Sequence, residues 1–122
     1  MKKILESTEN YLETILMLSQ QKGFVRAVDI ANELNYSKPS VSVAMKNLRE
    51  NKYIVLDENA HIKLTEKGRE IAQKMYDRHT LISDWLISLG VDSDIAINDA
   101  CKMEHDMSEE TFIALQKHIK GI

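Results

Sequence analysis

The sequence predicts a mostly α-helical protein with a small β wing, organised as a winged helix-turn-helix followed by a further helical region. Three observations support this fold class. The 122 residues include only four glycines and one proline, so helix-breaking residues are rare. Apolar residues recur at helical spacing through most of the chain. The run YIVLDENAHIKLT instead predicts two short strands around a polar turn.

The first three helices are expected in the first half of the chain. TENYLETILMLSQQK carries apolar residues at helical spacing and is followed by Gly23, a good helix terminator. After a short extended piece at residues 24–26, VDIANELN predicts a second, shorter helix. In SKPSVSVAMKNLRENKYI, Ser37 is a suitable N-cap and Pro39 is tolerated in the first turn. The buried face of this third helix is expected to hold Val41, Ala44, Met45 and Leu48.

The wing and three more helices complete the expected order. Thr65 and Ser108 are suitable caps for the helices that follow them. The strands and helices predicted here are Ile54–Leu56, His61–Leu64, a long helix from Glu66 to about Leu89, Ser93–Asp106 and Glu109–Ile119. This order places the winged helix-turn-helix at residues 1–64 and the second helical domain at residues 65–122.

The net charge of −3 hides an uneven distribution along the chain. Residues 22–53 hold six basic and three acidic side chains, which gives a net charge of +3. Residues 77–122 hold four basic and nine acidic side chains, which gives −5. A basic segment followed by an acidic one indicates one face for an anion and another for cations.

The helix after the tight turn is the predicted DNA-reading element. The major groove of DNA admits one α-helix, whose first turns present short polar groups to base edges while lysines hold phosphates. The same side chains would also fit an ordinary solvated helix face, and a winged topology also serves protein–protein contacts. The residues predicted to face DNA are Ser37, Lys38, Pro39, Ser40, Ser42, Val43 and Lys46, with Arg26, His61 and Lys63 as weaker phosphate contacts.

The segment CKMEHDM places three metal-binding groups on one helix. Cys101, Glu104 and His105 lie at i, i+3 and i+4, so their side chains share a face within reach of one cation. Three ligands rarely complete a transition-metal shell, so other helices are expected to contribute. The candidates are Asn10 and Glu13 on the first helix and His79 on the long helix. Each of these residues also has an ordinary explanation as a helix cap, a solvent-facing carboxylate or a packed side chain.

The chain has one cysteine and no long apolar run. A single cysteine cannot form an internal disulfide, which is consistent with a reducing compartment. The opening MKKILESTENY lacks the apolar core and the cleavage site of a signal peptide, and nothing predicts a membrane span. We therefore expect a cytoplasmic protein that does not enter a membrane.

Five motifs, taken in order, resemble the diphtheria-toxin-repressor family of metal-dependent transcriptional repressors, in particular its short, manganese-regulator-like members. They are NYLETI, VRAVDIANELNYSKPSVSVAMKNL, LTEKGREIA, RHTLISDWL and NDACKMEHDMS. The resemblance implies an N-terminal winged helix and a helical dimerisation region with a metal site, without a third, SH3-like domain. It also implies a homodimer that binds a palindromic operator in double-stranded DNA and represses metal-uptake genes.

The resemblance further implies a set of metal ligands. Cys101, Glu104 and His105 match ligands of the regulatory metal, and Asn10 stands where the first helix supplies another. Glu13 and His79 match ligands of a second metal in manganese-type relatives. Two departures matter: Asn10 replaces an Asp or a Met, and Cys101 stands where the manganese type has a carboxylate and the iron type a cysteine. Because thiolate is a soft ligand, we expect Fe(II) to be favoured over Mn(II), with Zn(II), Co(II) or Ni(II) as substitutes.

Other classes of function compete with a metal-dependent regulator. The leading alternative is a metal-independent winged-helix regulator that senses a small molecule or a partner protein. A metal-dependent hydrolase is less consistent with the sequence, because no cleft-building sheet and no separate general base are predicted. A metal buffer would bind the ion without salt-sensitive DNA affinity. We therefore expect a regulator and not an enzyme.

Overall fold

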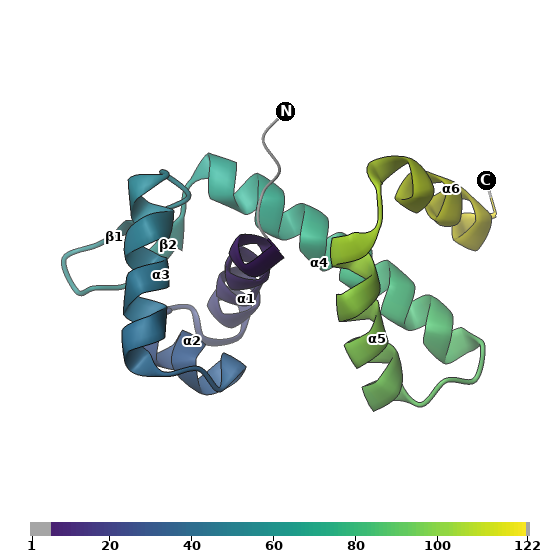
Figure 1. The fold of residues 1–122 in the computed structure, drawn as a ribbon, viewed down its shortest axis with the longest axis horizontal. Coiled ribbons are helices and arrows are strands. Elements are labelled where there is room, and N and C mark those ends of the chain that lie inside the picture. The colour runs from purple at the N-terminus through teal and green to yellow at the C-terminus, as the bar shows by residue number, and fades with distance from the viewer. Residues whose placement is uncertain (1–5, 122) are drawn as a thin grey trace. The chain divides into compact units, whose positions relative to one another are not determined.

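The computed structural model describes residues 6–121 (Figure 1). Its elements are α1 (Glu6–Lys22), α2 (Ala27–Leu34), α3 (Lys38–Glu50), β1 (Ile54–Leu56), β2 (Ile62–Leu64), α4 (Glu66–Ser88), α5 (Ser93–Asp106) and α6 (Glu109–Lys120). The predicted fold class, mostly α with a small β wing, is confirmed. No helix in the described part of the chain is long and apolar enough to cross a membrane.

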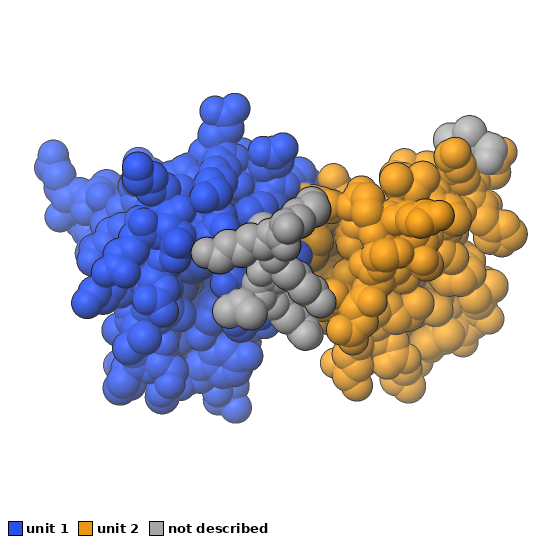
Figure 2. Space-filling view, turned by 45° about the horizontal axis from the view of Figure 1, so that its top comes forward, with its two compact units in different colours: residues 1–73 blue, residues 74–122 orange. Residues whose placement is uncertain are grey.

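The chain divides into two compact units, Met1–Gln73 and Lys74–Ile122 (Figure 2). Unit 1 holds α1, α2, α3 and both strands, and unit 2 holds α5 and α6. The long helix α4 continues from one unit into the other. The predicted division into a DNA-binding domain (1–64) and a metal-binding domain (65–122) stays a prediction, because compact units do not show which function each part performs.

Local side-chain hydrogen bonds fix the ends of the helices in unit 1. The Ser37 hydroxyl oxygen accepts a hydrogen bond from the Ser40 backbone N–H (3.3 Å), as expected of the cap of α3. The Thr65 hydroxyl caps α4 by accepting from the Gly68 backbone N–H (3.1 Å). Asn35 ends α2 in the left-handed conformation, with φ of 57°. The predicted turn between the second and third helices is therefore bounded by two capping residues, Asn35 at the end of α2 and Ser37 at the start of α3.

The wing is a two-stranded antiparallel ribbon, in which Ile54 pairs with Leu64 and Leu56 with Ile62. Its turn is organised by the Asp57 carboxylate, which accepts hydrogen bonds from two backbone N–H groups, those of residues 59 (2.8 Å) and 61 (3.0 Å). These bonds, above all the one from His61, hold the pKa of Asp57 below its usual range. The Ile62 backbone N–H also donates to the Val25 carbonyl (2.7 Å), which ties the extended piece before α2 to the wing.

Each unit has its own buried apolar side chains. In unit 1 they come from α1, α2, α3, both strands and the extended piece before α2, because the apolar stripes expected from the sequence meet there. They include Leu12, Ile15, Leu16, Leu18, Val25, Ile30, Val41, Met45, Leu48, Ile54 and Ile62. In unit 2, Ile82, Ala100 and Phe112 form the core cluster, and partly buried neighbours such as Met103 pack against it.

The predicted boundaries differ from the structure by one or two residues. The second helix begins at Ala27 and not at Val28, because the Asp29 carboxylate accepts the Arg26 backbone N–H (2.9 Å) and sets the first turn, while Asn35 turns the chain as expected. The second strand begins at Ile62 and not at His61, whose N–H is bound by Asp57. The first helix includes Glu6, and the last extends to Lys120 before Gly121 turns left-handed.

Candidate metal centre and nucleic-acid interface

The last turns of α5 bring three metal-binding groups together. Cys101 Sγ, a Glu104 carboxylate oxygen and a His105 ring nitrogen all lie within 4.8 Å of one another. The spacing i, i+3 and i+4 produces this convergence, as the sequence predicts. His79 approaches the same carboxylate from α4, with its Nδ1 3.9 Å from Glu104 Oε2. Unit 2 alone therefore gathers four of the six predicted ligands.

The site is well shielded from water. The Glu104 and His105 side chains are 0% and 2% exposed, and His105 Nε2 lies 3.5 Å from Glu104 Oε1. Cys101 is half-buried and free of any disulfide. A buried carboxylate is stable as an anion only where positive charge or hydrogen bonds balance it. A thiolate, a carboxylate and two imidazoles match the ligand chemistry of a divalent transition metal, so the residues present fit such an ion.

The two remaining predicted ligands lie in α1, within unit 1. Glu13 is buried and Asn10 is half-buried. Their spacing places both side chains on the same face of α1. The Asn10 backbone carbonyl accepts a hydrogen bond from the Thr14 hydroxyl (2.8 Å), while its side-chain amide is a separate group. Their membership of a metal shell stays a prediction.

The exposed face of α3 carries the residues predicted to contact DNA. Ser37, Lys38, Pro39, Ser40, Ser42, Val43 and Lys46 are all exposed, and Val43 has 62% of its surface in solvent. Two of the serines also have structural partners, since the Ser37 hydroxyl donates to the Ser40 hydroxyl oxygen (2.8 Å). An apolar side chain as open as Val43 is available to a thymine methyl group.

A groove of about 370 Å³ lies between the start of α2, α3 and the wing. Apolar side chains such as Val28, Met45 and Leu56 line it together with three cationic residues, Arg26, Lys46 and Arg49. Arg49 is not among the residues predicted to contact DNA. Its spacing of three residues from Lys46 would have placed both on one face of the helix.

The predicted wing contacts are held in a small polar network. The Phe24 and His61 rings stack with their centroids 4.6 Å apart, and Arg26 Nη2 lies 3.4 Å from His61 Nε2. The Lys63 ammonium lies 3.9 Å from an Asp57 carboxylate oxygen. Arg26, the N-cap of α2, and Lys63, in the middle of β2, are both exposed, so both remain accessible to solvent.

Two family models match the chain in succession. Residues 3–62 match the model described as the iron-dependent repressor N-terminal DNA-binding domain. Residues 65–121 match the model of the iron-dependent repressor metal-binding and dimerisation domain. The first match contains α3 and most of the wing, and the second contains the cluster on α5.

Curated relatives and solved structures give the same result. The chain is 37% identical over 117 residues to the transcriptional regulator MntR of Escherichia coli O6:H1 (strain CFT073), covering 93% of this chain and 76% of the relative. It is 34% identical over 102 residues to MntR of Bacillus subtilis (strain 168), covering 84% and 72%. The structure of the manganese regulator SloR superposes with a TM-score of 0.81 at 30% identity and covers 93% of this chain. The chain spans 53% of that SloR chain, about half its length.

Proposed function

The chain belongs to the iron-dependent repressor family, and from this premise we propose that it is a DNA-binding transcriptional regulator controlled by a divalent metal. The family is one of transcriptional repressors and not of enzymes. In this proposal the protein acts in the cytoplasm as a homodimer, binds a palindromic operator in double-stranded DNA, and represses genes for metal uptake.

One observation carries the proposal. Within the part of the chain that matches a metal-binding domain, the ligand atoms of Cys101, Glu104 and His105 lie within 4.8 Å of one another. Such a set is common on exposed helices, but here Glu104 is buried and His79 approaches it from a second helix. A shielded site with softer and harder ligands is typical of a transition-metal centre.

The identity of the metal rests on two opposing arguments. The Cys101 thiolate favours Fe(II) over Mn(II), because thiolates prefer softer ions. Against this, SloR is named as a manganese regulator, and it is similar to this chain at 30% identity. We propose Fe(II) as the favoured ion, with Mn(II) as the alternative and Zn(II), Co(II) or Ni(II) as substitutes.

Ligands from α1 would couple metal binding to DNA binding. A bound divalent cation supplies a positive charge and coordination positions that oxygen, nitrogen and sulfur ligands share. We propose that Asn10 and Glu13, in the unit that carries α3, join the ligands in the unit that carries α5. Shared ligation would limit the positions that α3 can adopt, and a coupling of about 1–3 kcal/mol would suffice for a switch.

The DNA-binding role assigns α3 to the major groove. Its exposed first turns would contact base edges, while Lys38, Lys46 and Arg49 would contact phosphates. The two recognition helices of a dimer must reach successive major grooves, on the order of 34 Å apart, for both to bind at once. Because the DNA fixes this spacing, a small change in the position of α3 would decide whether one or both recognition helices of the dimer enter a major groove.

The decisive experiment measures DNA binding by fluorescence anisotropy with duplexes from upstream of the protein's own gene and of nearby transport genes. Titrations are done anaerobically with chelator, Fe(II), Mn(II) or Zn(II). We expect tight binding only with metal. The order in which the ions promote DNA binding shows which metal Cys101 and Asn10 select. Binding that chelator does not change would instead favour a metal-independent regulator.

Variants of the cluster test whether it is responsible for the metal response. Glu104→Ala and His105→Ala remove one ligand each and should abolish metal-dependent DNA binding while leaving a folded dimer. Asp106→Ala is the matched control, because it removes an exposed carboxylate from the same turn of α5. A full metal response in both ligand variants would contradict the proposal. Circular dichroism and sedimentation check the fold and the dimer.

A further inference from the structure

We propose that Arg78 is a positioning residue for the metal site, because its side chain holds the end of α5 from which Glu104 and His105 project. This inference rests on the proposed function of the cluster on α5. Arg78 is 4% exposed, although arginine is seldom buried without partners. It precedes His79 in the chain, and its role is one that neither the sequence motifs nor the ligand set assigns.

The end of α5 lacks the usual device for terminating a helix. The last four carbonyl groups of any helix have no partner within the helix, and a glycine in the left-handed conformation commonly supplies N–H groups to them. Here the C-cap is Met107, with extended backbone angles (φ −95°, ψ 134°). The carbonyls of this end must therefore obtain donors from elsewhere.

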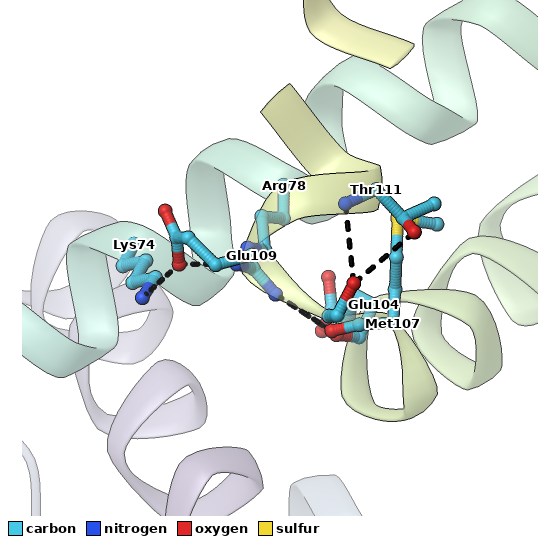
Figure 3. Close-up of polar contacts among 7 residues, drawn as sticks. Lys74, Arg78, Glu104, Met107, Glu109 and Thr111 are labelled. Carbon is cyan, nitrogen blue, oxygen red and sulfur yellow. Dashed lines mark hydrogen bonds and ion pairs between the residues drawn. The ribbon is translucent and has the colours of Figure 1, made fainter. Parts of the chain in front are cut away.

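Arg78 supplies those donors from α4 (Figure 3). Its Nη1 donates to the backbone carbonyls of Glu104 and Met107, both at 3.4 Å. A cation at this point also complements the negative end of the helix dipole. One guanidinium thus binds the backbone carbonyl of the proposed ligand Glu104 and that of Met107, the residue that ends the helix.

The guanidinium is itself fixed in place. Arg78 Nη2 donates to Glu109 Oε2 at 2.7 Å, and the guanidinium carbon lies 4.7 Å from the centre of the Phe112 ring. Lys74 binds the same carboxylate oxygen of Glu109 at 2.5 Å. Because Glu109 and Phe112 belong to α6, Arg78 connects three helices of unit 2 at the point where the ligands leave α5 (Figure 3).

Positioning follows from this geometry. Glu104 and His105 lie in the last turn of α5, the part of a helix that frays most easily. Metal affinity depends on ligand atoms being held near their bound positions before the ion arrives. Removing the Arg78 donors would leave the backbone of that turn less constrained. The expected consequence is a weaker and less uniform metal site in a protein that still folds.

A purely structural role makes a different prediction. If Arg78 only joined α4 to α6, its loss would lower thermal stability without altering the metal affinity of the folded protein. Metal affinity and the absorption spectrum of bound Co(II) are therefore the readouts that separate the two roles. The spectrum reports whether the Cys101 thiolate and the imidazoles remain together in the coordination shell.

The test compares Arg78→Met, Arg78→Lys and the control Lys74→Met by Co(II) titration of the full chain, with thermal unfolding of the metal-free proteins. Lys74→Met removes the other partner of Glu109 but leaves the α5 carbonyls bound. We expect about a 10-fold loss of Co(II) affinity in Arg78→Met, the lower end of the range for residues that support metal ligands. Arg78→Lys should fall between it and the wild type, and Lys74→Met should match the wild type.

The outcomes distinguish this inference from the proposed function. If wild-type protein binds Co(II) and both Arg78 variants bind it with wild-type affinity and spectrum, the positioning role is wrong and the proposed function stands. If wild-type protein binds no Co(II), both are wrong. Should Arg78→Met fail to fold, Arg78→Lys decides the question, because lysine keeps the charge but loses the fork whose Nη1 binds the two α5 carbonyls while its Nη2 binds Glu109.

Discussion

Gly68 occupies a position in α4 where a side chain has no room. A Cβ atom built there would lie 2.1 Å from the Tyr53 carbonyl oxygen, which is backbone and cannot turn aside. Helix propensity alone would favour alanine over glycine by about 1 kcal/mol. The clash should reverse this sign, so we expect Gly68→Ala to lower the free energy of unfolding by about 2 kcal/mol.

Urea denaturation of the metal-free protein measures this effect. Glu70→Ala, at an exposed position of the same helix, serves as the control and should leave stability nearly unchanged. A Gly68→Ala protein as stable as the wild type would show that the backbone at Tyr53 can move away. The sequence predicts a helix through Gly68 but not this contact, because Tyr53 is distant along the chain and precedes the wing.

At the scale of elements, α3 offers a test that separates helix capping from DNA contact. Ser37 and Ser42 are both exposed serines predicted to face DNA, but only Ser37 accepts the Ser40 backbone N–H at the helix start. Ser37→Ala should therefore lower the free energy of unfolding by about 1 kcal/mol, whereas Ser42→Ala should not. Both should weaken DNA binding if both hydroxyls contact DNA.

Chemical denaturation and anisotropy titrations of the two variants complete this comparison. A loss of stability in Ser42→Ala equal to that in Ser37→Ala would contradict the assigned cap. Unchanged DNA affinity in Ser42→Ala would remove that residue from the proposed interface. The pair is informative because the two substitutions delete the same atom on the same helix.

Elements whose signals are local were predictable from the sequence. The α3 cap at Ser37 and the strand Ile54–Leu56 follow from residues close together in the chain. So does most of the predicted buried stripe of α3: Val41, Met45 and Leu48 are buried, whereas Ala44, at the edge of the stripe, is only half-buried. The start of α2 differed from the prediction by one residue, because the Asp29 carboxylate binds the Arg26 backbone N–H and sets the first turn. Hydrogen-bond geometry determines which residue begins a helix, and the spacing of apolar residues in the sequence does not predict it.

At the scale of the whole molecule, part of the candidate site was likewise predictable from local sequence, and part depends on how the helices pack. Cys101, Glu104 and His105 were predictable as a cluster because one helix presents all three. His79 was also predicted as a candidate ligand, but its distance from Glu104 and the burial of Arg78 depend on packing between helices, which no local pattern specifies. The basic groove containing Arg49 likewise requires α2, α3 and the wing to meet.

Acid stability is a property to which both units contribute. The pKa of Asp29 is lowered, first by the hydrogen bond from the Arg26 backbone N–H, and that of Glu109 is lowered, first by the hydrogen bond from Lys74. The pKa of Asp57 in the wing is lowered as well. Each folded pKa lies below the unfolded value, so the unfolded chain binds more protons in acid. The stabilisation is therefore present above the ordinary carboxyl pKa of about 4 and is lost as pH falls through the lower folded values.

We expect the melting temperature of the metal-free protein, measured in chelator, to fall steadily as pH is lowered below about 4. Asp29→Asn removes one of the three responsible carboxylates and should make this decline shallower. Glu33→Gln, which alters an exposed carboxylate on the same helix, is the control and should keep the wild-type slope. A melting temperature that stays constant down to the lowest pH would mean that these carboxylates interact equally well in the unfolded chain. Chelator is essential to the measurement, because protons also compete with a metal for thiolate and imidazole ligands and would add a second acid-sensitive term.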